Sequence, residues 1–291
     1  MKDKCILITG SSKGIGLSIT QRLLQLGAKV IGIARDHDSI KVENKNYIKY
    51  TSDITDLIKF EKSIKVILKN HPEINVLISN AGYGEFGPLD NFSIKQINNF
   101  ITSNLTSHLI ISKYLLSHFK KIKIGDIIFI GSEASLMGAK NGSLYCTAKF
   151  GLRGLSQSLR KDVVGSNIRV CIINPGMVRT SFFDKLRFSP GDKTENSISL
   201  KDIANSTANL LSMDRNTVID EINISPATKL SSLISESVNW GVRFGSNLPK
   251  FISKTLTNLL KVSVETSSSA SGNLVGNSVA ITSYHQVVCP F

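Results

Sequence analysis

Short apolar runs alternate along most of the chain with longer segments whose apolar positions recur at helical spacing. Several of the runs are continuous in Ile, Val and Leu, which is typical of strands covered on both faces. The runs predict strands over Cys5–Thr9, Val30–Ala34, Val76–Ser79, Ile127–Ile130, Val170–Asn174 and Val218–Ile224. The helical spacing predicts helices over Ile15–Leu26, Asp56–Lys69, Ile97–Phe119 and Ser143–Val164. This alternation favours an α/β fold with a doubly wound parallel sheet.

The alternation ends near residue 225. We expect residues 1–225 to form one domain and residues 226–291 to form a partly helical C-terminal extension with a weakly structured end that includes Ser263–Ser271. Asn247-Leu248-Pro249 predicts a helix start, because proline is favoured in a first turn. Within 247–262 an apolar stripe with flanking lysines follows: Phe251, Ile252, Leu256, Leu259 and Leu260, beside Lys250, Lys254 and Lys261. Two interpretations stay open: the stripe packs on the domain or a partner subunit, or it lies on an anionic membrane surface.

Composition narrows the function classes. With 41% apolar and 20% charged residues, the 291-residue chain is typical of a soluble globular protein. The formal net charge of +13 favours anionic partners, but the lysines are scattered. We therefore interpret them as a solvated surface and predict no nucleic acid partner.

The first apolar run is too short for a signal peptide, and no run is long enough to predict a spanning helix. The cysteines and histidines lack ligand spacing, so we expect no metal and no disulfide framework, which suits a reducing, cytoplasmic compartment. We expect His108 on a helix surface. The residues concerned are Cys5, Cys146, Cys171, Cys289, His37, His71, His108, His118 and His285.

A glycine-rich turn, Thr9–Gly16 (TGSSKGIG), joins the first strand directly to the first helix. Glycines permit a tight turn and close approach to a pyrophosphate, which the helix N-terminus also attracts. The strand before and the helix after meet the context expected of a Rossmann-type dinucleotide loop. The predicted contacts are Gly10, Ser12, Lys13, Gly14, Ile15 and Gly16.

The end of the second strand indicates which dinucleotide binds. An acidic residue there would favour NAD, but the strand ends at Ala34 and Arg35 follows. Arg35 and Lys13 could both form charge-assisted bonds with a 2′-phosphate, which predicts NADP rather than NAD. Asp36 weakens this inference if it pairs with Arg35, and two ordinary surface cations remain the alternative.

Tyr145 and Lys149 lie one helical turn apart and share a face. A nearby ammonium favours the phenolate and is expected to lower the pKa of Tyr145, so that the phenol could exchange a proton with a substrate oxygen. A core tyrosine beside a snorkelling lysine is the alternative. Ser132 follows the predicted strand Ile127–Ile130, so its hydroxyl would face a ligand at the carboxyl edge of the sheet.

Several motifs occur in one order: Thr9–Gly16, Ser79–Gly82 (SNAG), Asn104, Ser132, Tyr145 with Lys149, and Pro175-Gly176. In this order and spacing the chain resembles the short-chain dehydrogenase/reductase family over about residues 4–225. The resemblance implies catalytic roles for Asn104, Ser132, Tyr145 and Lys149, with Asn104 holding a water linked to Lys149. It implies further cofactor contacts from Asp53, Ile54, Asn80, Ala81, Gly82, Tyr145, Lys149, Pro175, Gly176, Val178 and Thr180. Ser79 stands where the family often has asparagine.

The function implied is NADP-dependent hydride transfer between NADPH and a carbonyl or alcohol substrate, with a homodimer or homotetramer as the assembly. A non-catalytic NADP(H)-binding sensor or scaffold is the alternative. Phe182, Phe183, Leu186 and Phe188 could form an apolar lid near the turn at Pro190-Gly191, and Tyr83, Phe86 and Leu89 a wall. This favours an apolar or amphiphilic substrate, although simple packing stays open. The segment Val218–Pro226 is similar to the closing strand of family members acting on small hydroxy acids.

Overall fold

The computed structural model describes residues 1–37, 42–233 and 286–288. The predicted amphipathic stripe within 247–262, the Ser-rich stretch, Cys289 and His285 lie outside these residues. None of the helices in the described ranges is long and apolar enough to cross a bilayer.

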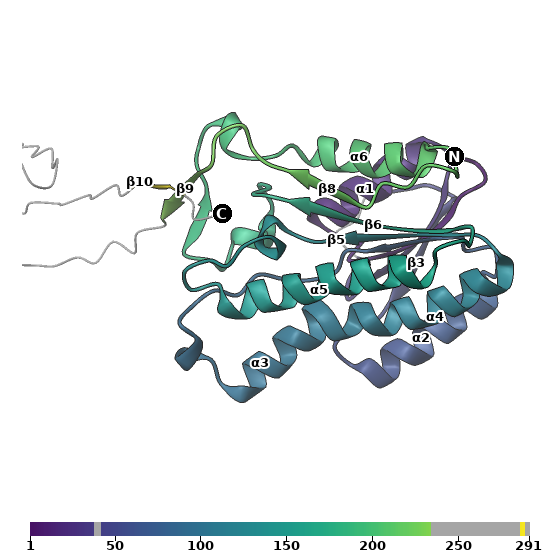
Figure 1. The fold of residues 1–291 in the computed structure, drawn as a ribbon, viewed down its shortest axis with the longest axis horizontal. Helices are drawn as coiled ribbons and strands as arrows, with labels where there is room; N and C mark the ends of the chain where they lie inside the picture. The colour runs from purple at the N-terminus through teal and green to yellow at the C-terminus, as the bar shows by residue number, and fades with distance from the viewer. Residues whose placement is uncertain (38–41, 234–285, 289–291) are drawn as a thin grey trace, which may run out of the picture.

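A parallel sheet of seven strands forms the centre of the described molecule (Figure 1). Its spatial order is β3-β2-β1-β4-β5-β6-β8. The bounds are β1 Cys5–Thr9, β2 Lys29–Ala34, β3 Tyr47–Thr51, β4 Val76–Ser79, β5 Gly125–Ile130, β6 Ile168–Pro175 and β8 Glu221–Ile224. The predicted doubly wound parallel sheet is therefore confirmed.

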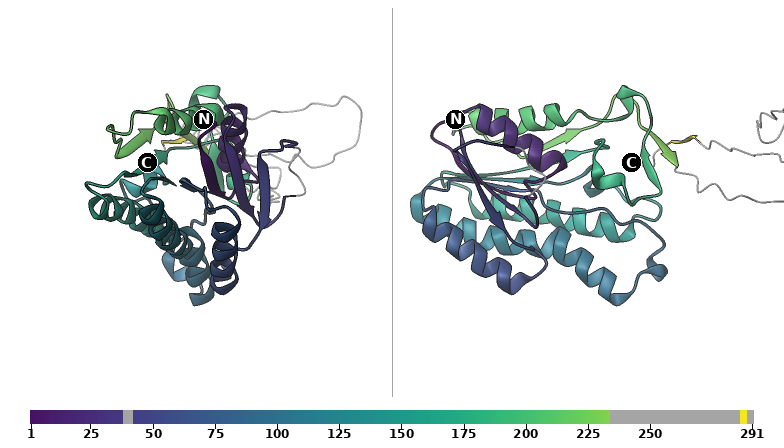
Figure 2. Two further views of the ribbon diagram at one scale, coloured as in Figure 1. Left: turned by 90° about the vertical axis from the view of Figure 1, so that its right-hand side faces the viewer. Right: turned by 180° about the vertical axis from the view of Figure 1, so that it is seen from behind.

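Helices cover both faces of this sheet, as Figure 2 shows from two further directions. On one face lie α1 (Gly14–Gln25) and α6 (Leu200–Ser212), which pack on alternate residues of the strands. On the other face lie α2 (Leu57–Asn70), α4 (Ser107–Ile122) and α5 (Ser143–Asp162). The strands are buried on both faces because of these two layers, which explains their continuous apolar sequence.

The predicted single helix over Ile97–Phe119 is wrong in one respect. The segment begins earlier as α3 (Ile94–Ile101), widens into a π-helical turn over Thr102–Thr106, and continues as α4. The apolar spacing runs through the turn, so the sequence pattern does not reveal it. π-helical turns are frequent at functional sites, and this one carries Asn104.

A small second sheet lies beside the carboxyl edge of the main one. The strands β7 (Phe188–Pro190) and β9 (Leu230–Leu233) pair antiparallel, and β10 (Gln286–Val288) pairs with β9. The hydrogen bond from the Thr228 backbone N–H to the Glu195 carbonyl adds to this attachment. The first residues after 225 are therefore hydrogen-bonded to the segment that follows β6.

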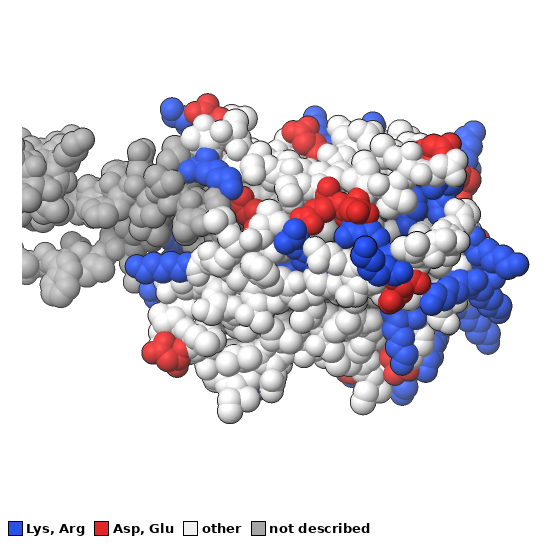
Figure 3. All heavy atoms as spheres, viewed as in Figure 1, with Lys and Arg blue, Asp and Glu red and all other residues white. Residues whose placement is uncertain are grey.

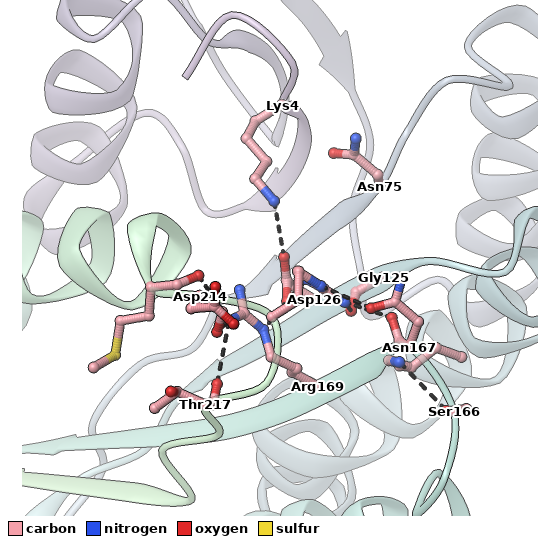
Figure 4. Close-up of polar contacts among 12 residues, drawn as sticks. Lys4, Asn75, Gly125, Asp126, Ser166, Asn167, Arg169, Asp214 and Thr217 are labelled. Carbon is pink, nitrogen blue, oxygen red and sulfur yellow. Dashed lines mark hydrogen bonds and ion pairs between the residues drawn. The ribbon is translucent and has the colours of Figure 1, made fainter.

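The amino edge of the main sheet is held by one buried carboxylate, Asp126 at the start of β5 (Figure 4). It pairs with Lys4 at 3.2 Å, Arg169 at 2.7 Å and Arg215 at 2.6 Å. Arg169 also donates to the carbonyls of Met213, Asp214 and Thr217. This Asp126 cluster joins the residue before β1, the strands β5 and β6, and the loop after α6. Figure 3 shows that, on the face drawn, Lys and Arg gather at the end of the molecule that holds the N-terminus.

Candidate active site

A cavity of about 820 Å³ opens at the carboxyl edge of the sheet. This is the edge where ligands bind in open α/β sheets. Its wall includes all four predicted catalytic residues, Asn104, Ser132, Tyr145 and Lys149. It also includes every predicted cofactor contact except Gly16: Gly10, Ser12, Lys13, Gly14, Ile15, Arg35, Asp53, Ile54, Asn80, Ala81, Gly82, Pro175, Gly176, Val178 and Thr180.

The glycine loop has the geometry of a phosphate cradle. Gly10 and Gly14 adopt positive φ angles of 69° and 53°, which favour glycine. The first turn of α1 has no side-chain cap at Lys13, so its N–H groups are open to an anion. Gly16 serves packing instead, because a Cβ there would lie 2.1 Å from the carbonyl oxygen of Gly10. These residues fit a dinucleotide pyrophosphate.

The turn after β4 forms the next part of the wall. The backbone N–H groups of Asn80 and Ala81 both donate to Thr9 Oγ1, at 3.0 Å and 3.1 Å. The Asn104 side chain accepts from the Tyr83 N–H at 3.2 Å and donates to the Phe100 carbonyl at 3.1 Å. The π-helical turn therefore fixes Asn104 against this turn, and its amide is fully buried.

The expectation that His108 lies on a helix surface is wrong. Its side chain is 1% exposed, and its two ring nitrogens contact the Ser79 hydroxyl at 2.6 Å and the Ala81 carbonyl at 2.9 Å. Burial and the charge of Lys149 lower the pKa of His108 to about 3, so the ring is neutral. Nε2–H then donates to Ala81, and Nδ1 accepts from Ser79. Ser79, the departure from the family pattern, is the donor that completes this contact.

Ser132, Tyr145 and Lys149 come from β5 and α5 and meet at the cavity. Ser132 follows β5 and caps the next short turn, where its Oγ accepts from the Ala134 N–H at 3.1 Å. Tyr145 and Lys149 lie one turn apart on α5, and both are at least nine-tenths buried. The Lys149 Nζ lies 5.7 Å from the centre of the Tyr145 ring and 3.4 Å from the Ile130 carbonyl oxygen, to which it donates.

The expected direction of the Tyr145 pKa is contradicted by the structure. Burial raises the pKa of Tyr145 to about 12, and a hydrogen bond with Ser132 only partly opposes this. Burial also lowers the pKa of Lys149 to about 8. Removal from water is therefore the main influence on the pKa of both groups.

Aromatic rings surround the Tyr145 side of the cavity. The Phe86, Phe100 and Phe182 ring centres lie 4.9 Å, 6.3 Å and 5.9 Å from that of Tyr145. Four of the predicted lid and wall residues besides Phe86 line the cavity: Tyr83, Phe182, Phe183 and Phe188. Leu186 packs behind the Phe183 cluster, and Leu89 is 53% exposed at the surface, so neither lines the cavity.

The opposite end of the cavity holds the polar side chains predicted for the adenosine. Arg35 is exposed at the end of β2, and Lys13 is exposed in the glycine loop. The Asp53 carboxylate accepts from the Thr55 N–H at 2.9 Å and from its hydroxyl at 2.7 Å. These two exposed cations would suit a phosphate. The described residues offer no group of three or more metal-ligating side chains.

Sequence reasoning missed one charged pair at this site. Glu133 follows Ser132 directly, lines the cavity and has a side chain only 10% exposed. Lys229, 96 residues further along the chain, pairs with Glu133 Oε2 at 2.8 Å. The position of an acid next to Ser132 was a signal that could have identified it. Its partner was beyond sequence reasoning because the contact depends on the fold after β8.

Comparisons with known proteins agree on one family. Residues 4–189 match the family model described as short chain dehydrogenase. The 3-oxoacyl-(acyl-carrier-protein) reductase FabG of Buchnera aphidicola is 31% identical over 198 residues, 67% of this chain and 81% of that protein. The 3-ketodihydrosphingosine reductase of Bacteroides thetaiotaomicron is 30% identical over 65% of this chain and 69% of that protein.

Solved structures show the same fold. Serine dehydrogenase from Escherichia coli aligns with a TM-score of 0.66 at 23% identity, over 76% of this chain and 96% of that one. The structure of ElxO with NADP bound aligns with a TM-score of 0.69 at 24% identity, over 77% of this chain and 97% of that one.

Proposed function

The chain belongs to the short-chain dehydrogenase family, and we propose that it uses NADP(H) to interconvert a carbonyl and an alcohol, with Tyr145 exchanging the proton. One observation carries this proposal. Ser132, Tyr145 and Lys149 line the same cavity as a glycine loop shaped for a pyrophosphate. When bound, NADPH would supply the hydride.

Each side chain has a role that follows from its position. Tyr145 donates its phenolic proton to the substrate oxygen during reduction, and a pKa near 12 keeps that proton in place until the oxygen becomes basic. Ser132 donates a hydrogen bond to the same oxygen as charge develops there. Lys149 supplies positive charge beside the Tyr145 ring. Together with Asn104 it would hold a water through which Tyr145 regains from solvent the proton that it donates.

We propose NADP(H) rather than NAD(H) as the cofactor. Arg35 and Lys13 are exposed at the adenosine end of the cavity, where they can bind a 2′-phosphate. Related folds add support, since ElxO and the closed form of serine dehydrogenase were both solved with NADP. Gly10, Ser12, Gly14 and Ile15 would contact the pyrophosphate and Thr180 the nicotinamide.

We propose an apolar or amphiphilic substrate. Phe86, Phe182 and Phe188 supply apolar wall within reach of Tyr145. A chain of carbon atoms beside the reacting carbon would bury its surface against these rings.

Further parts of the proposal concern the oligomeric state, the location in the cell and the C-terminal extension. A homodimer or homotetramer is supported by large exposed apolar side chains on α4 and α5, Leu109 and Phe150, each 44% exposed. We propose a cytoplasmic protein whose extension begins near residue 226 and whose residues 247–262 either pack on the protein or contact a membrane. Light scattering of the purified chain tests the oligomeric state. Vesicle binding by the full chain, compared with a form ending at Leu233, tests the membrane contact.

The test of the function is NADPH consumption over a panel of ketones and aldehydes, repeated with NADH and with Tyr145→Phe. We expect NADPH oxidation by the wild type and a loss of at least about a hundredfold in Tyr145→Phe, because the acid is removed. The variant should still bind NADPH, as measured by fluorescence titration. Binding without turnover of any substrate by the wild type would replace the proposal with a sensor or scaffold.

A further inference from the structure

Glu133 places a carboxylate beside the proposed catalytic residues. It follows Ser132 directly, and both residues line the cavity beside Tyr145. Reduction of a carbonyl develops negative charge on the substrate oxygen, which a neighbouring carboxylate opposes. Burial is the main cause of the raised pKa of Tyr145, and the charge of Glu133 adds to it. A neutral side chain at this position would not oppose the negative charge that develops on the substrate oxygen.

The carboxylate is only partly neutralised by the protein. Lys229 Nζ binds Oε2 at 2.8 Å, but its side chain is 37% exposed, so water shares its charge. The other oxygen, Oε1, accepts no hydrogen bond from any residue in the described ranges. A side chain only 10% exposed then retains an open acceptor that faces a cavity.

The surroundings of Glu133 keep room for a ligand group. Glu133 lines the cavity of about 820 Å³, which leaves space beside its carboxylate for a second group. A Cβ on Gly176 would lie only 3.1 Å from both carboxylate oxygens, so glycine at this position avoids a tight contact with the acid. Aromatic rings stand nearby on the Tyr145 side, and their faces favour cations as well as carbon chains. The open acceptor, the free space and the aromatic wall therefore suit one kind of group, an ammonium.

We propose that Glu133 recognises the substrate: the cavity takes a carbonyl or alcohol compound that carries an ammonium group close to the reacting carbon and an apolar chain beyond it. This rests on the proposed function. The ammonium donates to Oε1, while Lys229 binds Oε2. The bound cation also offsets the effect of Glu133 on the charge that develops at the substrate oxygen.

The test compares matched alcohols in the oxidation direction, with NADP⁺ and NADPH absorbance as the readout. One substrate is a vicinal amino alcohol with an octyl chain, and the other is the vicinal diol of the same chain. The quantity measured is the ratio of their kcat/KM values. We expect a ratio of at least about ten in the wild type, which a hydrogen bond to a charged group can supply.

The variants assign the preference to one side chain. Glu133→Gln should bring the ratio to about 1, whatever its absolute rates, because the amide keeps the shape and loses the charge. Lys229→Met should keep or raise the ratio, because the carboxylate loses its competing cation. Asp184→Asn is the matched control, since Asp184 is an exposed carboxylate on the same cavity, and it should leave the ratio within about twofold. Melting temperatures check that each variant folds.

Failure of this inference is distinguishable from failure of the proposed function. Calorimetric titration of the NADP⁺-saturated protein with the two alcohols measures recognition without turnover. Tighter binding of the amino alcohol with no oxidation would keep the recognition and sink the proposed reaction. Equal binding and equal turnover in the wild type, a preference kept by Glu133→Gln, or a ratio of about 1 in Lys229→Met would each overturn the role of Glu133.

Discussion

Replacing Asp126 by asparagine is expected to destabilise the fold without touching the chemistry. The carboxylate is 4% exposed and neutralises three cations at once. Of these, Lys4 and Arg169 are about nine-tenths buried, so Asp126→Asn leaves two cations out of water with no opposite charge. Arg215 is 27% exposed and can be solvated. Breaking a buried ion pair typically lowers the free energy of unfolding by about 3–5 kcal/mol.

The remaining contacts of the arginine limit the loss. Arg169 Nη1 keeps its carbonyl acceptors in the loop after α6, at 3.1–3.3 Å, and the asparagine oxygen can still accept one hydrogen bond. We therefore expect a loss near the lower end, about 3 kcal/mol. For a protein of this size that corresponds to a melting temperature lower by roughly 6–12 °C.

The pH dependence gives the effect a second signature. Burial opposes ionisation of Asp126, but the bond from Arg169 and the charges of Lys4 and Arg215 prevail and hold its pKa below the usual range. A carboxyl whose pKa is lower in the folded state stabilises fully above its unfolded pKa, near 3.9, and loses this contribution as the pH falls through the folded value. The difference between wild type and Asp126→Asn should stay constant at neutral pH and narrow below about pH 4.

The assay is thermal unfolding followed by circular dichroism at pH 7, with urea unfolding across the acidic range. The matched control is Glu73→Gln, which breaks the 2.6 Å pair with Lys29 at the surface, where both side chains are more than a third exposed. That change should alter the free energy of unfolding by less than about 1 kcal/mol. If Asp126→Asn melts within about 2 °C of the wild type, Asp126 does not neutralise Lys4 and Arg169 to the extent proposed.

Three other predictions concern the cavity. Arg35→Ser should raise the KM for NADPH roughly tenfold and leave the KM for NADH within about twofold, because a charge-assisted bond to the 2′-phosphate is lost. Equal changes in KM for both cofactors would contradict this role of Arg35. Since burial lowers the pKa of Lys149 to about 8, its ammonium is lost as the pH rises through that value, and the kcat/KM for ketone reduction should fall in the same range; a profile flat well above it would count against this role. His108→Leu leaves the Ala81 carbonyl and Ser79 hydroxyl unpaired and should weaken NADPH binding roughly tenfold by fluorescence titration, whereas His108→Gln should retain most of the affinity.

Much of the fold followed from the sequence because the central strands are buried on both faces. Their continuous apolar runs have no other ready explanation, and the predicted bounds of β1 and β4 agree with the structure. The edge strand β3 is absent from the predicted strands, since its burial alternates and two of its five residues, Lys49 and Thr51, are polar. The helix α6 was also missed. Its buried face includes the small residues Ala204, Thr207 and Ala208, which give a weak apolar signal.

The functional site, like the fold, was predictable only in part. The motifs placed Ser132, Tyr145 and Lys149 correctly at one cavity, because strand ends and helical spacing fix their positions locally. The direction of the Tyr145 pKa could not be read from spacing, because it depends on how much water the folded chain excludes. The partners of His108 lie 29 and 27 residues away, so only the packing of α4 against β4 reveals them.

The strand β5 has a buried carboxylate near each end. We expect Asp126 to stabilise the fold and Glu133 to bind substrate, and their partners differ accordingly. Asp126, near its start, is paired with three cationic side chains. Glu133, three residues after its end, has a single partner that is 37% exposed. Glu133→Gln would free a lysine that water can solvate, so it should lower the melting temperature by much less than Asp126→Asn does. An equal loss of stability in both variants would instead show that the Glu133–Lys229 pair mainly stabilises the contact between the segment after β5 and the residues after β8.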